Sequence, residues 1–362
     1  MRAIEAKLSD DHGSITFTIS TEADSLTIVL VTTIFCLLVR VLLQLPKLTR
    51  AAELAAKGGT PPVATSGSGL KLATLTPAQR TELAAARTTF LAAGGVLDEH
   101  ADAFLLRFLL VHDFSAAAAA PQLRATAAWR NETGAARVRA EYAAGATLAA
   151  HEPFVRMLRT IGAVVGHRSS ADGDVLALMH VGSFDPASWL AVMSSEEFSA
   201  VVMRLLEFLS YRADALTMAS GSSLVRVALI LDYEGLALKH LDPRIFVRLL
   251  PVMAWPDAHY PECLAVALAV NAPWLFSRLW AILSPAFSAA LQARIQILKP
   301  ADSPAAIAAL AAAADLPRGF GGELERMPAD VRAALGFDRL GAAELAQLFP
   351  GNGTLGGYAR VR

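Results

Sequence analysis

Three short apolar runs separated by longer segments constrain the fold of this chain more than any other feature. They lie at residues 175–181, 225–231 and 264–270, and valine, leucine and alanine fill most of their positions. Runs of this length that are apolar at almost every position predict strands buried on both faces of a sheet. The chain is therefore expected to build a sheet whose core strands are covered on both sides.

The segments around these runs complete the pattern. Residues 194–212 predict a helix, because Ser195 is followed by two glutamates in the first turn. Shorter strand candidates lie at residues 161–165 and 295–298. Strands that alternate with helices predict an α/β fold with a mixed or parallel sheet under helical cover.

A helical cluster is predicted ahead of the sheet. Thr76 and Pro77 form an N-cap followed by proline at the first helical position, so a helix should run from there to about residue 93. Further helices are expected at residues 102–110 and 115–130, which carry apolar residues at helical spacing.

Residues 25–45 form an apolar run about as long as the roughly 20 residues that a bilayer-spanning helix needs. Acidic residues precede the run and basic residues follow it, which by the positive-inside rule places the C-terminal side in the cytosol. We predict a transmembrane helix here. A packed or interfacial amphipathic helix and a targeting peptide remain alternatives.

No catalytic motif is evident in the sequence. A formal net charge of −1 argues against a nucleic-acid-binding protein, and the scattered histidines show no metal-ligand spacing, so neither catalytic residues nor a metal site are assigned. Asp257 and His259 are expected to be surface structure, and His180 a satisfied core or edge histidine. Asp232 follows a strand end, where functional residues gather in α/β folds, although it equally suits a cap of the turn at Gly235.

The segment at residues 260–287 is the most informative. After the strand at 264–270, Pro273 should start a helix and Pro285 should end it. Large apolar residues repeat at helical spacing on one side of that helix. They are Leu275, Phe276, Leu279, Trp280 and Leu283. A core helix is one interpretation of such a face.

Several motifs together resemble the CRAL-TRIO (Sec14-like) lipid-binding family. Tyr260-Pro261-Glu262, the Asn271-Ala272-Pro273-Trp274 turn and Leu283-Ser284-Pro285 resemble its signature. Further matches occur in the family's order along residues 76–323. They are Phe104-Leu105-Leu106-Arg107-Phe108 with Trp129-Arg130, Val181-Gly182-Ser183-Phe184-Asp185-Pro186, Asp232-Tyr233-Glu234-Gly235-Leu236, Ile295-Gln296-Ile297-Leu298 and Leu316-Pro317-Arg318-Gly319-Phe320-Gly321-Gly322.

The apolar run, the linker composition and the resemblance over residues 76–323 together give an expected domain order. We expect an N-terminal tail at 1–24, the membrane helix at 25–45, a linker at 46–75, a CRAL-TRIO N-terminal helical region at 76–145, the lipid-binding domain at 146–325 and a C-terminal extension at 326–362.

The resemblance also implies that residues 273–283 form a gate over an apolar cavity, which opens at a membrane so that a lipid can exchange. Covering an acyl chain requires bulky apolar side chains, because each buried CH₂ contributes about 0.8 kcal/mol. The expected partners are a lipid ligand and a membrane surface, without nucleic acid and without a cofactor other than the bound lipid. The implied lipid-binding residues are Thr217, Phe246, Leu250, Met253, Trp255, Trp274, Phe276, Leu279, Trp280 and Leu283.

The sequence departs from phosphoinositide-binding members of the family at three positions. Asp113 stands where a lysine is typical, Leu249 where a glutamate is typical, and Ser284 where a lysine is typical. A phosphate group needs paired cations or a helix N-terminus. We therefore expect that phosphatidylinositol is not the preferred ligand.

Two other functions stay open at this point. The domain would act as a regulator or scaffold if its cavity were vestigial, or as a hydrolase if a triad were assembled from distant residues. The predicted cytosolic orientation also implies that the sequons at Asn131 and Asn352 stay without glycan.

Overall fold

The computed structural model describes residues 5–8, 15–18, 74–160, 163–164, 170, 173–221, 224–325 and 327–341. The chain divides into two compact units, residues 1–62 and 63–362. In the first, strands β1 (Glu5–Leu8) and β2 (Ile15–Thr18) pair antiparallel. The predicted membrane helix at 25–45, most of the linker and the end of the C-terminal extension lie outside the described residues.

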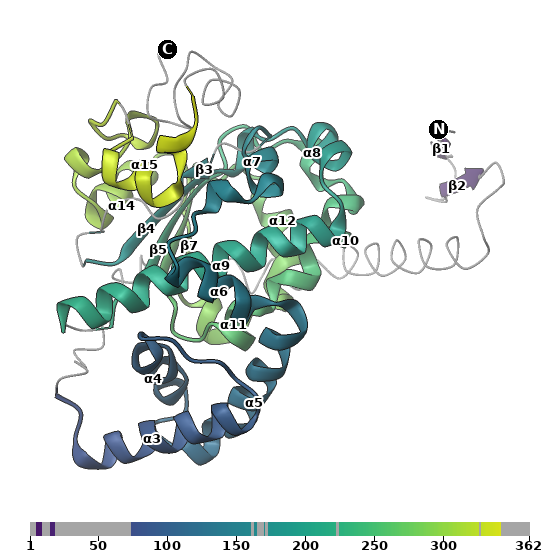
Figure 1. Cartoon of the computed structure of the whole chain (residues 1–362). Helices are drawn as coiled ribbons and strands as arrows, with labels where there is room; N and C mark the ends of the chain where they lie inside the picture. The colour runs from purple at the N-terminus through teal and green to yellow at the C-terminus, as the bar shows by residue number, and fades with distance from the viewer. Residues whose placement is uncertain are drawn as a thin grey trace. The chain divides into compact units, whose positions relative to one another are not determined.

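The second unit is built on a five-stranded sheet, which confirms the predicted α/β class (Figure 1). Four strands are parallel, in the order β4-β5-β6-β7, and the short strand β3 pairs antiparallel with β4 at the edge. Their bounds are β3 (Ala163–Val164), β4 (Val175–His180), β5 (Val227–Asp232), β6 (Leu264–Val270) and β7 (Ile295–Ile297). Five of the six residues of β4 are buried, as expected for a strand under cover on both faces.

The helix between β4 and β5 is longer than predicted. Helix α9 (Ser195–Ser220) begins at a capping box made by Ser194 and Glu197 and ends at Gly221, which adopts the left-handed conformation. Its last two turns extend beyond residue 212, because Ala213, Asp214 and Thr217 are buried against the rest of the domain. The helix packs against β4 and β5.

The predicted helical cluster is present below the sheet in Figure 1. Its helices are α3 (Pro77–Ala92), α4 (Ala101–Val111), α5 (Ala116–Thr133) and α6 (Ala135–Ala143). Thr76 caps α3 as predicted, in a capping box with Gln79, and Ser115 caps α5. Phe90, Phe104 and other apolar side chains form a core of their own between α3, α4 and α5.

Buried ion pairs join this cluster to the sheet domain. Arg107 on α4 donates from Nε to Asp214 on α9 at 2.9 Å, and Arg139 on α6 donates to the other oxygen of the same carboxylate at 2.9 Å. Arg107 also donates to the backbone carbonyls of Val225 and Glu262. These bonds hold the helical cluster against both α9 and the strand connections.

Several shorter helices were not predicted from the sequence. They are α7 (Glu152–Leu158), α8 (Pro186–Val192), α11 (Trp255–His259), α13 (Ala289–Gln292) and α15 (Ala329–Leu335). The structure also contains α10 (Pro243–Met253) and α14 (Ser303–Leu310), and α14 overlaps the alanine run at residues 305–314, whose composition favours a helix. Short runs like these give weak periodic signals, and packing onto the domain decides their conformation. Among the described helices none is, on its own, long and apolar enough to cross a bilayer, although the bent pair α4 and α5 meets that criterion together.

Candidate functional site: an apolar helix at the strand ends

The candidate site lies where β5 and β6 end. After Val270 the chain turns at Asn271, whose φ is 52°, and the backbone N–H of Ala272 bonds to Leu298 beyond β7. Helix α12 (Phe276–Leu283) follows. The prediction that this helix starts at Pro273 was wrong by one turn, because residues 273–275 form a turn in which the Phe276 N–H bonds to the Pro273 carbonyl.

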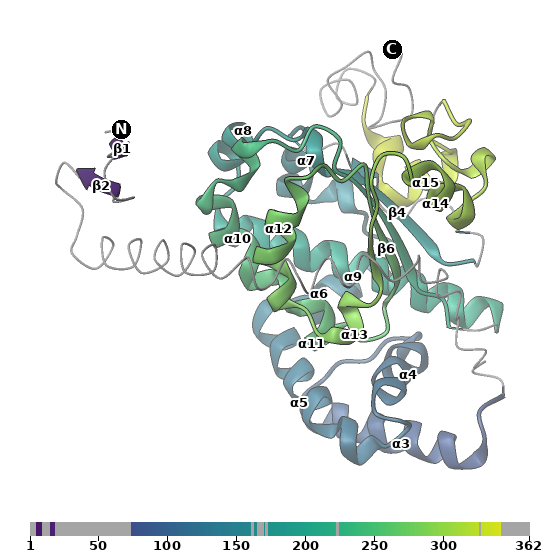
Figure 2. The same cartoon turned by 180° about the vertical axis from the view of Figure 1, so that it is seen from behind.

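Helix α12 lies beside α10 (Figure 2). A cluster of apolar side chains, here called the gate cluster, joins α12 to α10 and to the strand ends. The Phe276 ring stands edge-on to the Tyr233 ring, with centroids 4.5 Å apart. Every core member is at most 8% exposed. The core members are Tyr233, Leu236, Phe246, Ala269, Ala272, Leu275, Phe276, Leu279 and Leu283, with Leu241, Leu249, Met253, Trp280 and Ile282 half-buried around them.

A polar fastening holds the base of the gate cluster. Asp232, the last residue of β5, accepts hydrogen bonds from His180 Nδ1 at 2.9 Å, Asn271 Nδ2 at 3.0 Å and the backbone N–H of Glu234 at 2.9 Å. Burial by itself would raise the pKa of Asp232, but the bonds from His180 and Asn271 outweigh it and hold that pKa below its usual value. Phe320 stacks on the His180 ring, with centroids 4.3 Å apart.

This geometry decides between the interpretations of two residues. His180 is a buried core histidine at the end of β4, and its Nδ1 bonds to Asp232. Asp232 bonds to the turn that leads to Gly235, and it also ties the start of the segment before α12 to the sheet. Three adjacent strands therefore contribute to one fastening at their carboxyl ends.

Six of the ten predicted ligand residues meet in the gate cluster. Phe276, Leu279 and Leu283 of α12 are buried there, and Trp280 is half-buried beside them. The facing helix α10 contributes the buried Phe246 and the half-buried Met253.

The structure places the other four predicted residues elsewhere. Thr217 is buried on α9, where its hydroxyl donates to the Ala213 carbonyl at 2.8 Å and accepts from the Val225 N–H at 2.9 Å. Leu250 points outward from α10 with 39% exposure, and Trp274 is 77% exposed just before α12.

Trp255 belongs to a separate aromatic group. It stands edge-on to Trp129 at 5.3 Å, and His259 stacks on Trp129 at 4.1 Å. Burial, together with the nearby Arg130 charge, lowers the pKa of His259 to about 4. Asp257 accepts hydrogen bonds from the backbone and hydroxyl of Ser288 at the start of α13, so this stretch is structural, as expected.

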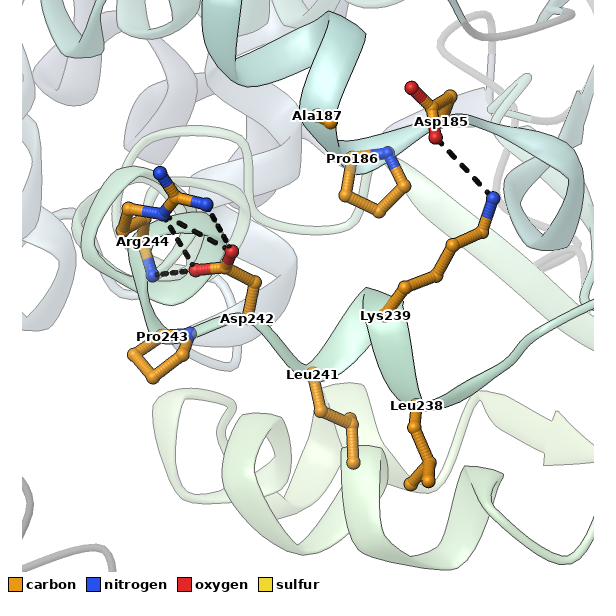
Figure 3. A pocket seen from close by; sticks show the side chains of 9 residues that line it. All are labelled: Asp185, Pro186, Ala187, Leu238, Lys239, Leu241, Asp242, Pro243 and Arg244. Carbon is orange, nitrogen blue, oxygen red and sulfur yellow. Dashed lines mark hydrogen bonds and ion pairs between the residues drawn. The ribbon is translucent and has the colours of Figure 1, made fainter. Parts of the chain in front are cut away.

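Sequence reasoning missed a surface pocket beside the gate cluster (Figure 3). The pocket holds about 420 Å³ and opens to solvent between α8, α10 and the short helix η4 (Leu238–Leu241). The sequence does contain a signal for this pocket. Two of its lining segments, Asp185-Pro186 and Asp242-Pro243, each consist of a helix-capping aspartate followed by proline. Those two helix starts face each other across the pocket. Its lining residues are Asp185, Pro186, Ala187, Leu238, Lys239, Leu241, Asp242, Pro243 and Arg244.

The described part of the chain contains no group of three or more histidine, cysteine or acidic side chains placed to hold a metal ion. The one cysteine described, Cys263, is a free thiol whose pKa burial raises to about 11. Such a thiol stays protonated at neutral pH and is a poor nucleophile.

Comparisons with known proteins find similarity to one protein family. Residues 160–322 match the family model of the CRAL/TRIO domain. A CRAL-TRIO domain-containing protein of Caenorhabditis elegans is 27% identical over 184 residues, 51% of this chain and 24% of that protein. The Anopheles gambiae protein real-time is 27% identical over 213 residues, 59% of this chain and 30% of that protein.

The matched region thus spans less than a third of the length of these curated relatives. A crystal structure of Sfh5 is similar over 59% of this chain and 70% of its own, at 15% identity and a TM-score of 0.45.

Proposed function

Because the chain belongs to the CRAL/TRIO family, we propose that it binds one hydrophobic small molecule or phospholipid in a cavity beneath α12 and transfers or senses it at membranes. In this proposal α12 is the gate, which closes over the ligand in water and moves away at a bilayer. No residue is assigned a catalytic role.

The observation that carries the proposal is the apolar contact between α12 and α10. Phe276, Leu279 and Leu283 are buried in that contact, and Ser277 and Arg278 on the other side of α12 are exposed. Full burial of such a side chain contributes about 1.5–3 kcal/mol, so exposing all three to water costs roughly 5–9 kcal/mol. A bilayer offsets this cost, because it offers the same side chains an apolar environment.

The connections at both ends of α12 are compatible with movement of this helix relative to the sheet. Its N-terminal side follows the rigid fastening of Asn271 to Asp232 and to Ser303 Oγ, which accepts from the Asn271 N–H at 2.9 Å. Its C-terminal side runs into the short helix η5 (Ser284–Ala286), where Pro285 stops the α-helical hydrogen bonding. The fastening would remain in place while α12 swings, because its bonds lie before the helix.

We propose that phosphatidylinositol is not the preferred ligand. Leu249, at the position where a glutamate is typical, packs its side chain into the gate cluster. No cation stands at the aligned positions of Asp113 and Ser284. Efficient transfer of phosphatidylinositol by the purified protein would contradict this choice.

We also propose that residues 25–45 anchor the chain in a membrane, with the lipid-binding domain on the cytosolic side. The support is the sequence alone: an apolar run with acidic residues before it and basic residues after it. Asn131 lies within α5, and its side chain donates to the Gly94 carbonyl at 2.9 Å. Glycan at Asn131 or Asn352 in the expressed protein would overturn the orientation.

The test is native mass spectrometry of the purified full chain, followed by extraction and identification of any bound lipid. One hydrophobic ligand per chain supports the proposal, and a chain without ligand favours the regulator or scaffold function. Turnover of an ester panel, abolished by substitution of one serine or histidine, would favour a hydrolase instead.

A matched pair of variants links the ligand to the gate. Leu279→Ala removes a buried contact of the gate cluster, whereas Ser277→Ala changes an exposed residue of the same helix. We expect the first to lose bound lipid faster than the wild type during dilution, and the second to retain it. Equal retention by both variants would exclude α12 as the gate.

A further inference from the structure

The pocket between α8, η4 and α10 has a balanced set of charges. Asp185 and Lys239 form one pair, with 3.4 Å between the carboxylate and the ammonium nitrogen, and Asp242 and Arg244 form the other at 2.6 Å (Figure 3). Two negative and two positive groups therefore line one open cavity. A ligand that carries a single sign of charge gains from one half of this lining and is repelled by the other half.

The hydrogen-bonding capacity of the two carboxylates is largely used by the protein. Asp185 Oδ2 accepts from the backbone and hydroxyl of Ser188, and these bonds keep the pKa of Asp185 below its usual value. Asp242 accepts from the side chain and backbone of Arg244, which likewise lowers the pKa of Asp242. Both carboxylates are thus ionised at neutral pH.

Lys239 and Arg244 both have N–H groups that can still donate a hydrogen bond. The Lys239 ammonium has three N–H groups and makes one long contact, to Asp185. Arg244 uses Nε and one terminal nitrogen on Asp242, which leaves its Nη1 group without a partner among the described residues. An anionic group that enters the pocket therefore meets a donor from Lys239 on one side or from Arg244 on the other, each with a carboxylate beside it (Figure 3).

A phosphodiester joined to an ammonium group matches this arrangement. Its phosphate would bond to the cation of one pair, and its ammonium would lie near the carboxylate of the other pair. A phosphate with two or more negative charges would be repelled by the same carboxylates. The volume of about 420 Å³ equals about 14 water molecules at about 30 Å³ each, which is enough for a small headgroup.

The surroundings favour a headgroup in a bilayer over a free small molecule. Leu238, which lines the pocket, is 70% exposed. Val247 is 56% exposed and Leu250 39% exposed, and they follow Arg244 at three-residue steps along the outer face of α10. An apolar surface continuous with a charged pocket is typical of a membrane contact.

The pocket also adjoins the gate. Leu241 of η4 lines the pocket and packs its side chain against the gate cluster. The next residue toward the chain start, His240, is buried, and its Nε2 bonds to the Phe184 carbonyl at 2.9 Å. The short helix η4 therefore contacts both the pocket and the gate cluster, and it is firmly packed on the domain.

We propose that this pocket docks the zwitterionic headgroup of a bilayer phospholipid, such as phosphatidylcholine, and so holds the α10–α12 face on the membrane surface. This site is separate from the cavity for the transferred ligand. The inference rests on the proposed lipid-binding function, because docking serves to bring the gate to a bilayer.

The experiment follows backbone hydrogen exchange of residues 238–244 in the full chain assembled with lipid nanodiscs. Discs of phosphatidylcholine are compared with discs of a galactolipid, which carries no phosphate, and with discs of phosphatidylglycerol, which is anionic. We expect exchange in the phosphatidylcholine discs to be about tenfold slower than in the other two, the factor that corresponds to about 1.4 kcal/mol of docking.

Two double variants make the test specific. Lys239→Gln with Arg244→Gln removes the free donors of the pocket, and we expect it to lose the slowing. Lys299→Gln with Arg80→Gln removes one exposed lysine and one exposed arginine outside the pocket, and it should keep the slowing. Thermal unfolding confirms that both variants fold.

Several outcomes would overturn the inference. They are equal exchange in phosphatidylcholine and galactolipid discs, stronger slowing in phosphatidylglycerol discs, or unchanged slowing in the pocket variant. Slowing that free phosphocholine in solution reproduces without discs would assign the pocket to a soluble ligand instead. The lipid content of each variant by native mass spectrometry separates failed docking from a failure of the proposed ligand binding.

Discussion

Asn271 donates its side-chain N–H to Asp232 across 3.0 Å while its own backbone holds a φ of 52°. Asparagine is one of the few residues with a side chain that adopts this left-handed conformation at low cost. The same residue therefore turns the chain at the end of β6 and ties the turn to the end of β5. The position of α12 depends on both properties.

Substitutions at Asn271 separate these two properties. Asn271→Gly keeps the left-handed conformation and loses the bond to Asp232, so we expect a loss of about 1–2 kcal/mol in the free energy of unfolding. Asn271→Ala loses the same bond and also replaces asparagine by a residue that adopts the left-handed conformation at a higher cost, so we expect a loss of about 2–4 kcal/mol. Urea unfolding of both variants measures the difference. Equal losses would show that the backbone conformation contributes nothing.

The sequence predicted the central strands and the helical cluster well, because each carries a strong local signal. The apolar runs at β4, β5 and β6 are short and almost uniform, and Thr76 and Ser115 mark two helix starts by their capping chemistry. The C-terminal end of α9 was missed, since its last turns depend on burial of Asp214 by arginines more than 70 residues away in sequence. Contacts with residues that are far away in the sequence leave no local pattern in the sequence of the helix itself.

The candidate site was predicted in part for a similar reason. The apolar face of α12 is visible as helical spacing, and Phe276, Leu279 and Leu283 lie where that spacing places them. Tyr233 and Leu236 were missed, because they come from a turn whose aromatic contact to α12 is set by the sheet register. The resemblance to a family also indicated Thr217, which the structure shows bonded to the backbone at the end of α9.

The buried carboxylate of Asp214 is expected to be essential for stability. It accepts bonds from Arg107 and Arg139, and both guanidinium groups are almost completely buried. Asp214→Asn leaves the buried Arg107 without its counter-charge and leaves Arg139 with Asp98 alone, so we expect a loss of about 3–5 kcal/mol in the free energy of unfolding. The control is Glu325→Gln, which removes one partner of the exposed ion pair with Arg318 and should cost at most about 1 kcal/mol. A similar effect of both changes would contradict the assigned role.

Gly182 lies where two chain segments approach closely. A Cβ on Gly182 would clash with the carbonyl oxygen of Glu234 and lie 2.5 Å from the Tyr233 backbone. We expect Gly182→Ala to lower the free energy of unfolding by about 3 kcal/mol, because backbone atoms on both sides must shift.

Gly173→Ala is the matched control for this prediction. Gly173 has a φ of 84° and open space around it, so only backbone strain of about 1 kcal/mol is expected there. Chemical denaturation of both variants at one pH compares the two costs. If Gly173→Ala were the more damaging change, the close approach at Gly182 would not limit stability.

His259 should make the stability of the domain depend on pH in mildly acidic solution. Its pKa is lowered to about 4 by burial against Trp129 and by the Arg130 charge, whereas the unfolded chain has the ordinary value of 6.5. Between pH 4 and 6.5 the unfolded state therefore binds more protons than the folded state, so stability rises with pH across this window. The contribution is complete above pH 6.5 and lost below pH 4.

The size of this effect follows from the exposure of the ring. His259 is only half-buried, so screening by solvent reduces the contribution to roughly 1–2 kcal/mol. His259→Gln keeps a polar partner near Thr126, whose hydroxyl lies 3.1 Å from His259 Nδ1, but does not titrate. We expect the variant to show a flatter dependence of unfolding free energy on pH between 4.5 and 6.5 than the wild type. The two curves would run parallel if His259 were protonated equally in the folded and unfolded states.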